Sequence, residues 1–254
     1  MHPTVRRLTT AGVIAAVIMA GMLATAARPN RRGQDPEQDR RRVEALRSGG
    51  LRAAAALNGS YVDVVSPSID NEPSSLRDLV GDSSLIVVGR ILNNSAALDK
   101  SGKRVLTDYE VQVERALKGK PHPSGLITVT MIGGRVSFAG GTWAQTVVGG
   151  APQPVNGDRL LFFLAPTRLR VDEEHRKLAH PGAETERQKQ DPTDPRGVNY
   201  STVRGVFGYY PLRADGVFPL SPRKHPLRSK YEAKAESVLL SDVIGAIREE
   251  RVKP

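Results

Sequence analysis

The stretch "GDRLLFFLAP" at residues 157–166 places five large apolar residues in a row between a Gly-Asp turn and a proline. A strand with one face in water alternates apolar and polar side chains, but Leu160 to Leu164 does not alternate. Each of these side chains gains about 1.5–3 kcal/mol when it leaves water, so neither face of the run can stay exposed. We therefore predict a strand that is covered on both of its faces.

A second stretch, "SLIVVGRIL" at residues 84–92, is also apolar without a break and predicts another central strand. Two further stretches, at residues 107–119 and 126–132, alternate and predict strands with one wet face each. The acids of the first wet face are Asp108, Glu110 and Glu114. This combination is typical of a small antiparallel barrel whose outer surface is partly covered by helices.

Two amphipathic segments can supply those helices. Residues 76–83 follow the candidate N-caps Ser74 and Ser75, and residues 237–252 space their apolar side chains at the helical period. Asp215-Gly216 predicts the turn of a hairpin between them. We expect a mainly β fold with flanking helices (α+β), in which a short N-terminal helix and a C-terminal helix cover a small antiparallel barrel.

The same patterns support a resemblance to a known family. The segments "SLRDLVGDSSLIVVGRI", "TDYEVQVERALKG", "ITVTMIGG" and "VVGGAPQPVNGDRLLFFL" resemble a group of exported bacterial proteins, over about residues 76–165. The region is similar to the five-stranded oligonucleotide/oligosaccharide-binding (OB) barrel of the netrin and metalloproteinase-inhibitor kind. The resemblance implies this fold and no activity. Such inhibitors ligate zinc through an N-terminal cysteine, and because this chain has no cysteine, that mechanism does not carry over.

Residues 1–27 have the pattern of an export signal. Arg6 and Arg7 precede an apolar stretch, and the small residues at 24–26 form a cleavage site. We expect an exported protein, in the periplasm, in the cell wall or secreted. If the signal is not cleaved, residues 8–27 are long enough to anchor the chain in a membrane.

The rest of the chain divides by composition. Residues 28–73 are charged and Arg-rich, which predicts a disordered tether, although helical turns broken at Gly49-Gly50 and a short edge strand at residues 61–65 are possible within it. Residues 74–254 are expected to form one domain. Its second polar stretch, residues 171–203, is expected to be a mobile insertion.

The chain carries a net charge of +10, which favours contact with polyanions or anionic lipid. A plain solvated tether is the simpler interpretation of the basic N-terminal segment, and no sequence-specific recognition of nucleic acid is expected. The arginines that can make such polyanion contacts are Arg28, Arg31, Arg32, Arg40, Arg41 and Arg42.

Few residues point to catalysis or to a cofactor. The absence of cysteine excludes thiolate chemistry and zinc–thiolate sites, and no G-x-S-x-G motif occurs. His175 and His180 are five residues apart, which does not place two imidazoles on one helical face, although Glu173 and Glu174 lie beside them. We expect no catalytic residue, no metal and no cofactor, and we favour a protein that is not an enzyme.

The best binding candidates lie in the Gly-rich segment before the opening stretch. Arg135, Phe138 and Trp143 can stack on a sugar, a base or a peptide, or Trp143 can instead plug one end of the barrel. The first hypothesis is an exported, non-enzymatic barrel module that binds a cell-envelope partner. The alternatives are a polyanion- or membrane-binding protein that acts through its basic tether, and an exported hydrolase.

Overall fold

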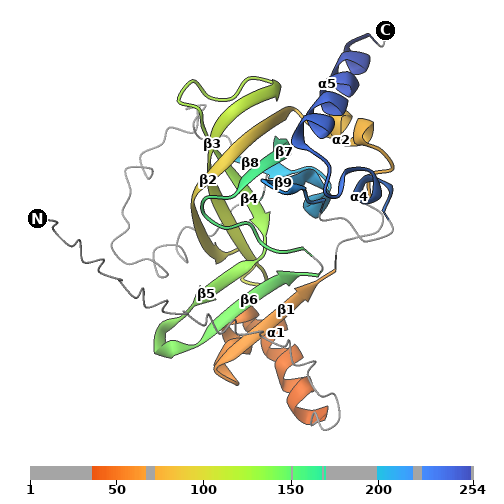
Figure 1. Ribbon diagram of the computed structural model, residues 1–254. Coiled ribbons are helices and arrows are strands. Elements are labelled where there is room, and N and C mark those ends of the chain that lie inside the picture. The colour runs from red at the N-terminus through yellow and green to blue at the C-terminus, as the bar shows by residue number, and fades with distance from the viewer. Residues whose placement is uncertain are drawn as a thin grey trace, which may run out of the picture.

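The computed structural model describes residues 36–66, 72–149, 151–167, 169, 199–219 and 225–252. It has a mixed α+β architecture, with a seven-stranded sheet, a small three-stranded sheet and helices toward both ends (Figure 1). The helices are α1 (Pro36–Ala56), α2 (Leu76–Asp82), η2 (Ala139–Gly141), η5 (Gly205–Gly208), α4 (Pro226–Tyr231) and α5 (Glu236–Val252). The strands are β1 (Ser60–Val65), β2 (Leu85–Leu98), β3 (Val105–Lys118), β4 (Leu126–Ile132), β5 (Gly134–Ser137), β6 (Trp143–Val148), β7 (Arg159–Pro166), β8 (Asn199–Thr202), β9 (Tyr209–Arg213) and β10 (Gly216–Val217).

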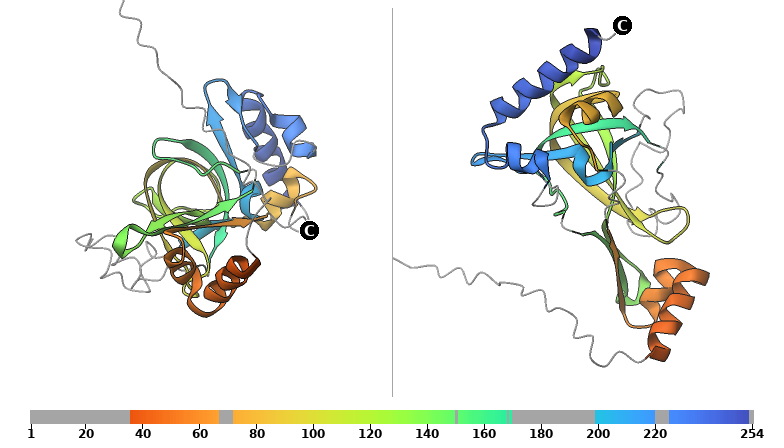
Figure 2. Two further views of the ribbon diagram at one scale, coloured as in Figure 1. Left: turned by 90° about the horizontal axis from the view of Figure 1, so that it is seen from below. Right: turned by 90° about the vertical axis from the view of Figure 1, so that its right-hand side faces the viewer.

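The seven-stranded sheet closes on itself through hydrogen bonds. Its order is β10-β9-β7-β2-β3-β4-β8, and β8 pairs a second time, with β7. Strands β7, β2, β3, β4 and β8 therefore form a ring, which Figure 2 shows end-on in its left view. The short strand β8 completes this ring because it lies parallel to β4 and antiparallel to β7.

Strand β7 is buried on both faces, as its sequence predicts. Leu160, Phe162 and Leu164 lie in a cluster with apolar side chains of β2, β3 and β4, on the inner face of the ring. Leu161 and Phe163 lie in a different cluster, with side chains of α2, α4 and α5. All five side chains have 0% exposure. The prediction of two-sided burial is confirmed.

Strand β2 shows the same division, and the helices on its outer side are the predicted ones. Ile86 and Val88 face the helices, whereas the residues between and before them face the inside of the ring. Helix α2 begins with a capping box in which the Ser75 hydroxyl accepts from the backbone N–H of Asp78. Helix α5 buries one apolar stripe against the same outer cluster, and α4 lies on the same side (Figure 1).

The predicted wet face of β3 is only partly wet. Asp108 is 8% exposed and accepts a hydrogen bond of 2.6 Å from the Thr130 hydroxyl. The reason is that the three-stranded sheet packs against this end of β3, where the Val105 N–H donates to the Thr146 hydroxyl at 2.9 Å. Glu114, at the other end of β3, remains exposed as predicted.

The expected disordered tether is wrong for residues 36–65. Helix α1 covers the three-stranded sheet, with Leu51, Ala54 and Ala55 buried, and β1 pairs with β6. The helical path breaks at Gly50, as expected, where φ is +67°. This segment is polar on average, but its few apolar residues lie on one side of α1 and pack against the three-stranded sheet.

Two other predicted segments, the insertion and the export signal, lie partly or wholly outside the described residues. Residues 199–202 form β8 and Val203 is buried, so the predicted mobile insertion is corrected at that end, and residues 171–198 lie outside the described residues. The predicted signal, residues 1–27, lies outside them as well. Within the described ranges, no helix has the length and apolar character that a membrane span requires.

Candidate binding surface

The three predicted binding residues belong to the β5–β6 hairpin of the small sheet, whose order is β1-β6-β5. In this hairpin, Arg135 pairs with Gln145 and Ser137 pairs with Trp143. Paired residues of adjacent strands share a face, so these four side chains lie on one side of the sheet. The side chains between them, such as Val136, lie on the opposite side and are buried against α1. The small sheet thus has one packed face and one open face.

Arg135 and Trp143 contact each other on the open face. The guanidinium carbon of Arg135 lies 4.0 Å from the centroid of the Trp143 ring, a close cation–π contact. Trp143 is half-buried and Arg135 is exposed. The interpretation of Trp143 as a plug of the ring is wrong, because Trp143 belongs to the small sheet and is not among the side chains that pack inside the ring.

Phe138 is separated from this pair. It packs with the cluster between α1 and the small sheet, and the guanidinium carbon of Arg52 lies 5.3 Å from the centroid of its ring. Alternation along the strand explains the difference, because Phe138 follows Ser137 and therefore points to the packed side. The structure brings two of the three predicted residues together and assigns the third to the core.

Strand β1 extends the open face, and sequence reasoning missed its contribution. The register pairs Ser60 with Trp143, Val62 with Gln145 and Val64 with Val147. The side chains of Val62 and Val64 are 48% and 65% exposed. We call this open side the tryptophan face. It consists of Ser60, Val62, Val64, Arg135, Ser137, Trp143, Gln145 and Val147.

The outer edge of β1 has no pairing strand among the described residues. The carbonyls of Gly59 and Val65 accept hydrogen bonds from the N–H groups of β6 and Gly149, so the odd-numbered residues of β1 bond inward. Successive residues of a strand direct their backbone groups to opposite sides, and Val62 and Val64 therefore direct theirs to the free edge. Natural edge strands are commonly guarded by lysine or proline, and "SYVDVV" has neither.

The one charged side chain of β1 does not guard the edge. Asp63 pairs in register with Thr146 and lies on the packed side of the sheet, where it is half-buried. Burial raises the pKa of its carboxyl, and the charge of Arg104 lowers it in part. The edge and the tryptophan face together offer backbone groups and apolar side chains to an extended chain.

The structure assigns a structural role to His225. His225 caps α4, where its Nδ1 accepts from the Leu227 N–H at 3.1 Å and its Nε2 lies 2.9 Å from the Pro73 carbonyl oxygen. No group of three or more metal-ligating side chains gathers within the described ranges. His175 and His180 lie outside those ranges, together with Glu173 and Glu174.

The structure describes three of the six arginines that were predicted to contact a polyanion. Arg40 and Arg41 pair with Glu37, and Arg42 pairs with Asp39 on the same helix. These pairs reduce the positive charge that α1 presents to a polyanion. Arg28, Arg31 and Arg32 lie outside the described residues.

The comparisons with known proteins add no family to this description. No protein-family model matches the chain, and no curated protein sequence matches it.

Proposed function

We propose that the protein is an exported binding module, not an enzyme, that captures an extended peptide segment of a cell-envelope protein. The observation that carries this proposal is the tryptophan face beside the unpaired edge of β1. The captured segment adds a strand to β1 through main-chain hydrogen bonds, which supply affinity for any extended chain. Val62, Val64 and the Trp143–Arg135 pair then select for side chains on one face of that strand.

The proposal includes the finer identity of the fold. The five-stranded ring is a small barrel of the OB or netrin type, and the α2-to-β7 region that resembles exported bacterial proteins is its frame. Support comes from the ring of pairings and from the two-sided burial of β7. In this account the barrel is a scaffold. It supports the β5–β6 hairpin, and β1 pairs with β6 of that hairpin.

Export belongs to the proposal as well. The signal pattern of residues 1–27 supports delivery to the cell envelope, with residues 8–27 as an anchor if they are retained. A module delivered in this way meets envelope proteins as its nearest partners.

The test uses a proline at the free edge. Val64→Pro removes an outward-facing N–H and leaves the inward bonds to β6, which is the one setting in which an edge strand tolerates proline. Val64→Thr is the matched control, since it keeps both the N–H and the β-branch. We expect one envelope protein to be captured from detergent-solubilised envelope by the wild type and by Val64→Thr, and to be lost with Val64→Pro and with Trp143→Ala. Equal capture by all four proteins, or by none, contradicts the proposal.

A further inference from the structure

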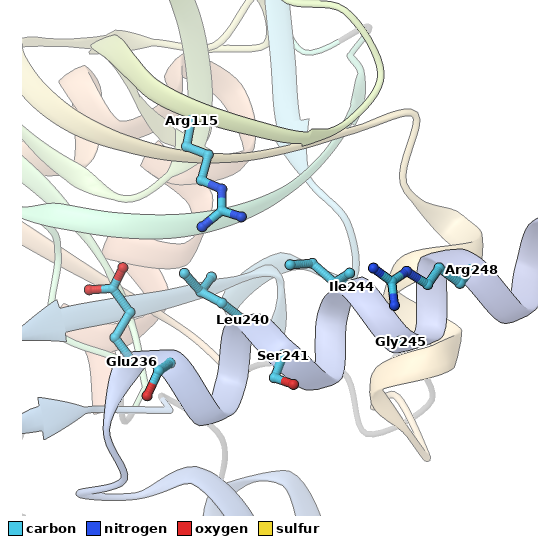
Figure 3. A pocket seen from close by; sticks show the side chains of 8 residues that line it. Arg115, Glu236, Leu240, Ser241, Ile244, Gly245 and Arg248 are labelled. Carbon is cyan, nitrogen blue, oxygen red and sulfur yellow. The ribbon is translucent and has the colours of Figure 1, made fainter.

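Helix α5 is held to the sheet at both of its ends and leaves a groove between them. At its start, the Arg159 guanidinium pairs with Glu236, with one contact of 3.0 Å from Nη2. At its end, Lys118 Nζ lies 2.7 Å from Glu250. Between these ion pairs an open groove of about 630 Å³ lies beside β3 (Figure 3). Its lining residues are Arg115, Glu236, Ser237, Leu240, Ser241, Ile244, Gly245 and Arg248.

Two arginines give this groove a positive charge. Arg115 extends from β3 toward α5, and Arg248 lies further along the helix (Figure 3). Both are exposed, and neither has an ion-pair partner among the described residues. Glu236 is the one acid of the lining, and it is already paired with Arg159. The hydrogen bond to Glu236 raises the pKa of the Arg159 guanidinium above its ordinary value. The net charge at the groove is therefore positive.

The floor of the groove is apolar. Leu240 is 7% exposed and Ile244 is half-buried, so both offer a hydrophobic surface beneath the two guanidinium groups. A Cβ atom placed on Gly245 meets nothing within 4 Å, so this glycine leaves open space along the helix. An occupant can therefore lie directly against the α5 backbone.

We propose that this groove binds an acidic peptide segment of a partner protein, with two carboxylates on either side of one apolar residue. Arg115 points toward the turn of α5 that carries Leu240, and eight residues separate Leu240 from Arg248. Eight residues of helix span about 12 Å, and four residues of an extended chain span about 13 Å. The spacing acid-x-apolar-x-acid places both carboxylates at the arginines and the apolar side chain over Leu240 and Ile244.

Charge complementarity favours this occupant. Guanidinium groups bind carboxylates bidentately, and such charge-assisted bonds are stronger than neutral ones. The groove is separate from the tryptophan face, because α5 and the small sheet lie at opposite ends of the molecule (Figure 1). The inference therefore does not depend on the proposed function.

The experiment titrates the full chain with the peptide acetyl-Asp-Ser-Leu-Ser-Asp-amide and follows backbone amide signals by NMR. We expect the Ser241 and Gly245 signals to shift. Arg115→Gln and Arg248→Gln should each weaken binding about tenfold. Arg251→Gln, an exposed arginine outside the groove, is the control and should change the affinity little. Val64→Pro should leave this titration unchanged, which separates its outcome from that of the proposed function.

Three results overturn the proposal. The first is the absence of shifts at millimolar peptide. The second is equal binding of the Asn-Ser-Leu-Ser-Asn peptide, which lacks the carboxylates. The third is arginine-dependent binding to phosphatidylglycerol vesicles without binding of the acidic peptide, which assigns the groove to a lipid surface instead.

Discussion

Leu161 and Phe162 are neighbours in the chain, yet they belong to different hydrophobic clusters. Leu161 packs among the helices, and Phe162 packs inside the ring. A single strand therefore links the two main cores of the protein, and each core depends on residues one position apart. A change at either position has no solvent-exposed direction in which to relax.

The first prediction concerns this strand. Leu161→Asp or Phe163→Asp places a carboxylate in a site with 0% exposure and no partner, at a cost of several kcal/mol. This cost is comparable to the whole stability of an ordinary domain, so we expect neither variant to fold. Leu92→Asp is the matched control, because Leu92 lies in β2 and is 47% exposed. Thermal unfolding by circular dichroism distinguishes the variants, and a cooperative transition in either β7 variant argues against two-sided burial.

The second prediction concerns alkaline pH. Burial raises the pKa of Tyr109, inside the ring, to about 12 from its ordinary value of 10. Above pH 10 the unfolded chain binds fewer protons at this site than the folded chain, so the free energy of unfolding falls as the pH rises toward 12. Well below pH 10 the tyrosine keeps its proton in both states, so it has no effect on the pH dependence there.

Tyr109→Phe should make that alkaline decline shallower, by at most about 1.4 kcal/mol per pH unit for one proton. Urea unfolding at a series of pH values from neutral to alkaline measures it. Tyr209 and Tyr210 also have raised pKa values because of burial, so part of the decline should remain in the variant. Identical slopes for the two proteins rule out a buried, protonated Tyr109.

At this scale the sequence was informative where burial is continuous and uninformative where it depends on a distant partner. Five apolar residues in a row predicted the environment of β7. Trp143 and Phe138 look alike in the sequence, and only the pairing of β5 with β6 assigns one to the open face and the other to the core. The sequence of this glycine-rich segment contains no pattern that predicts the pairing of β5 with β6.

At the scale of the elements, the docking of α1 depends on the backbone conformation of one glycine. Gly50 adopts a positive φ, and a Cβ atom there would lie 2.4 Å from the Gly102 carbonyl oxygen. The same oxygen accepts a hydrogen bond of 2.8 Å from the Leu51 N–H, which ties α1 to the β2–β3 turn. A side chain at position 50 must displace this contact.

The third prediction is that Gly50→Ala destabilises the protein by more than about 1 kcal/mol, since both the φ value and the close oxygen oppose it. Gly81→Ala, in α2, is the control. A Cβ there meets nothing within 4 Å, and replacing a helical glycine should be neutral or stabilising. Urea unfolding measures both changes. A Gly50→Ala variant as stable as the wild type would show that α1 does not dock as described.

The elements also show where sequence patterns stop being informative. The two helices over β7, the β2 and β3 strands and the β9–β10 hairpin follow from local periodicity, caps and turn residues. The parallel pairings of β1 with β6 and of β4 with β8 do not, because each joins short strands that are distant in the chain. The tryptophan face arises from the first of these pairings, and the closure of the ring depends on the second.

In the whole molecule, the well-covered core and the proposed binding surface lie on different sheets. The ring has its strands paired and its apolar faces covered, whereas the small sheet has one open face and one open edge. A hydrophobic edge without lysine or proline invites association, so its persistence beside a well-covered ring favours a binding role. The net charge of +10 helps to limit self-association of such a surface.

Amide hydrogen exchange, resolved by residue with NMR, tests this division most directly. The account predicts that the amides of Leu160 to Leu164 exchange only when the whole protein unfolds, because β7 is paired along both edges. Among the strand amides whose N–H points to a sheet edge, those of Val62 and Val64 are predicted to exchange fastest. Their exchange should slow when the envelope protein that the wild type captures is added. Protection of Val62 and Val64 equal to that of β7 in the unbound protein would contradict the free edge and the binding function inferred from it.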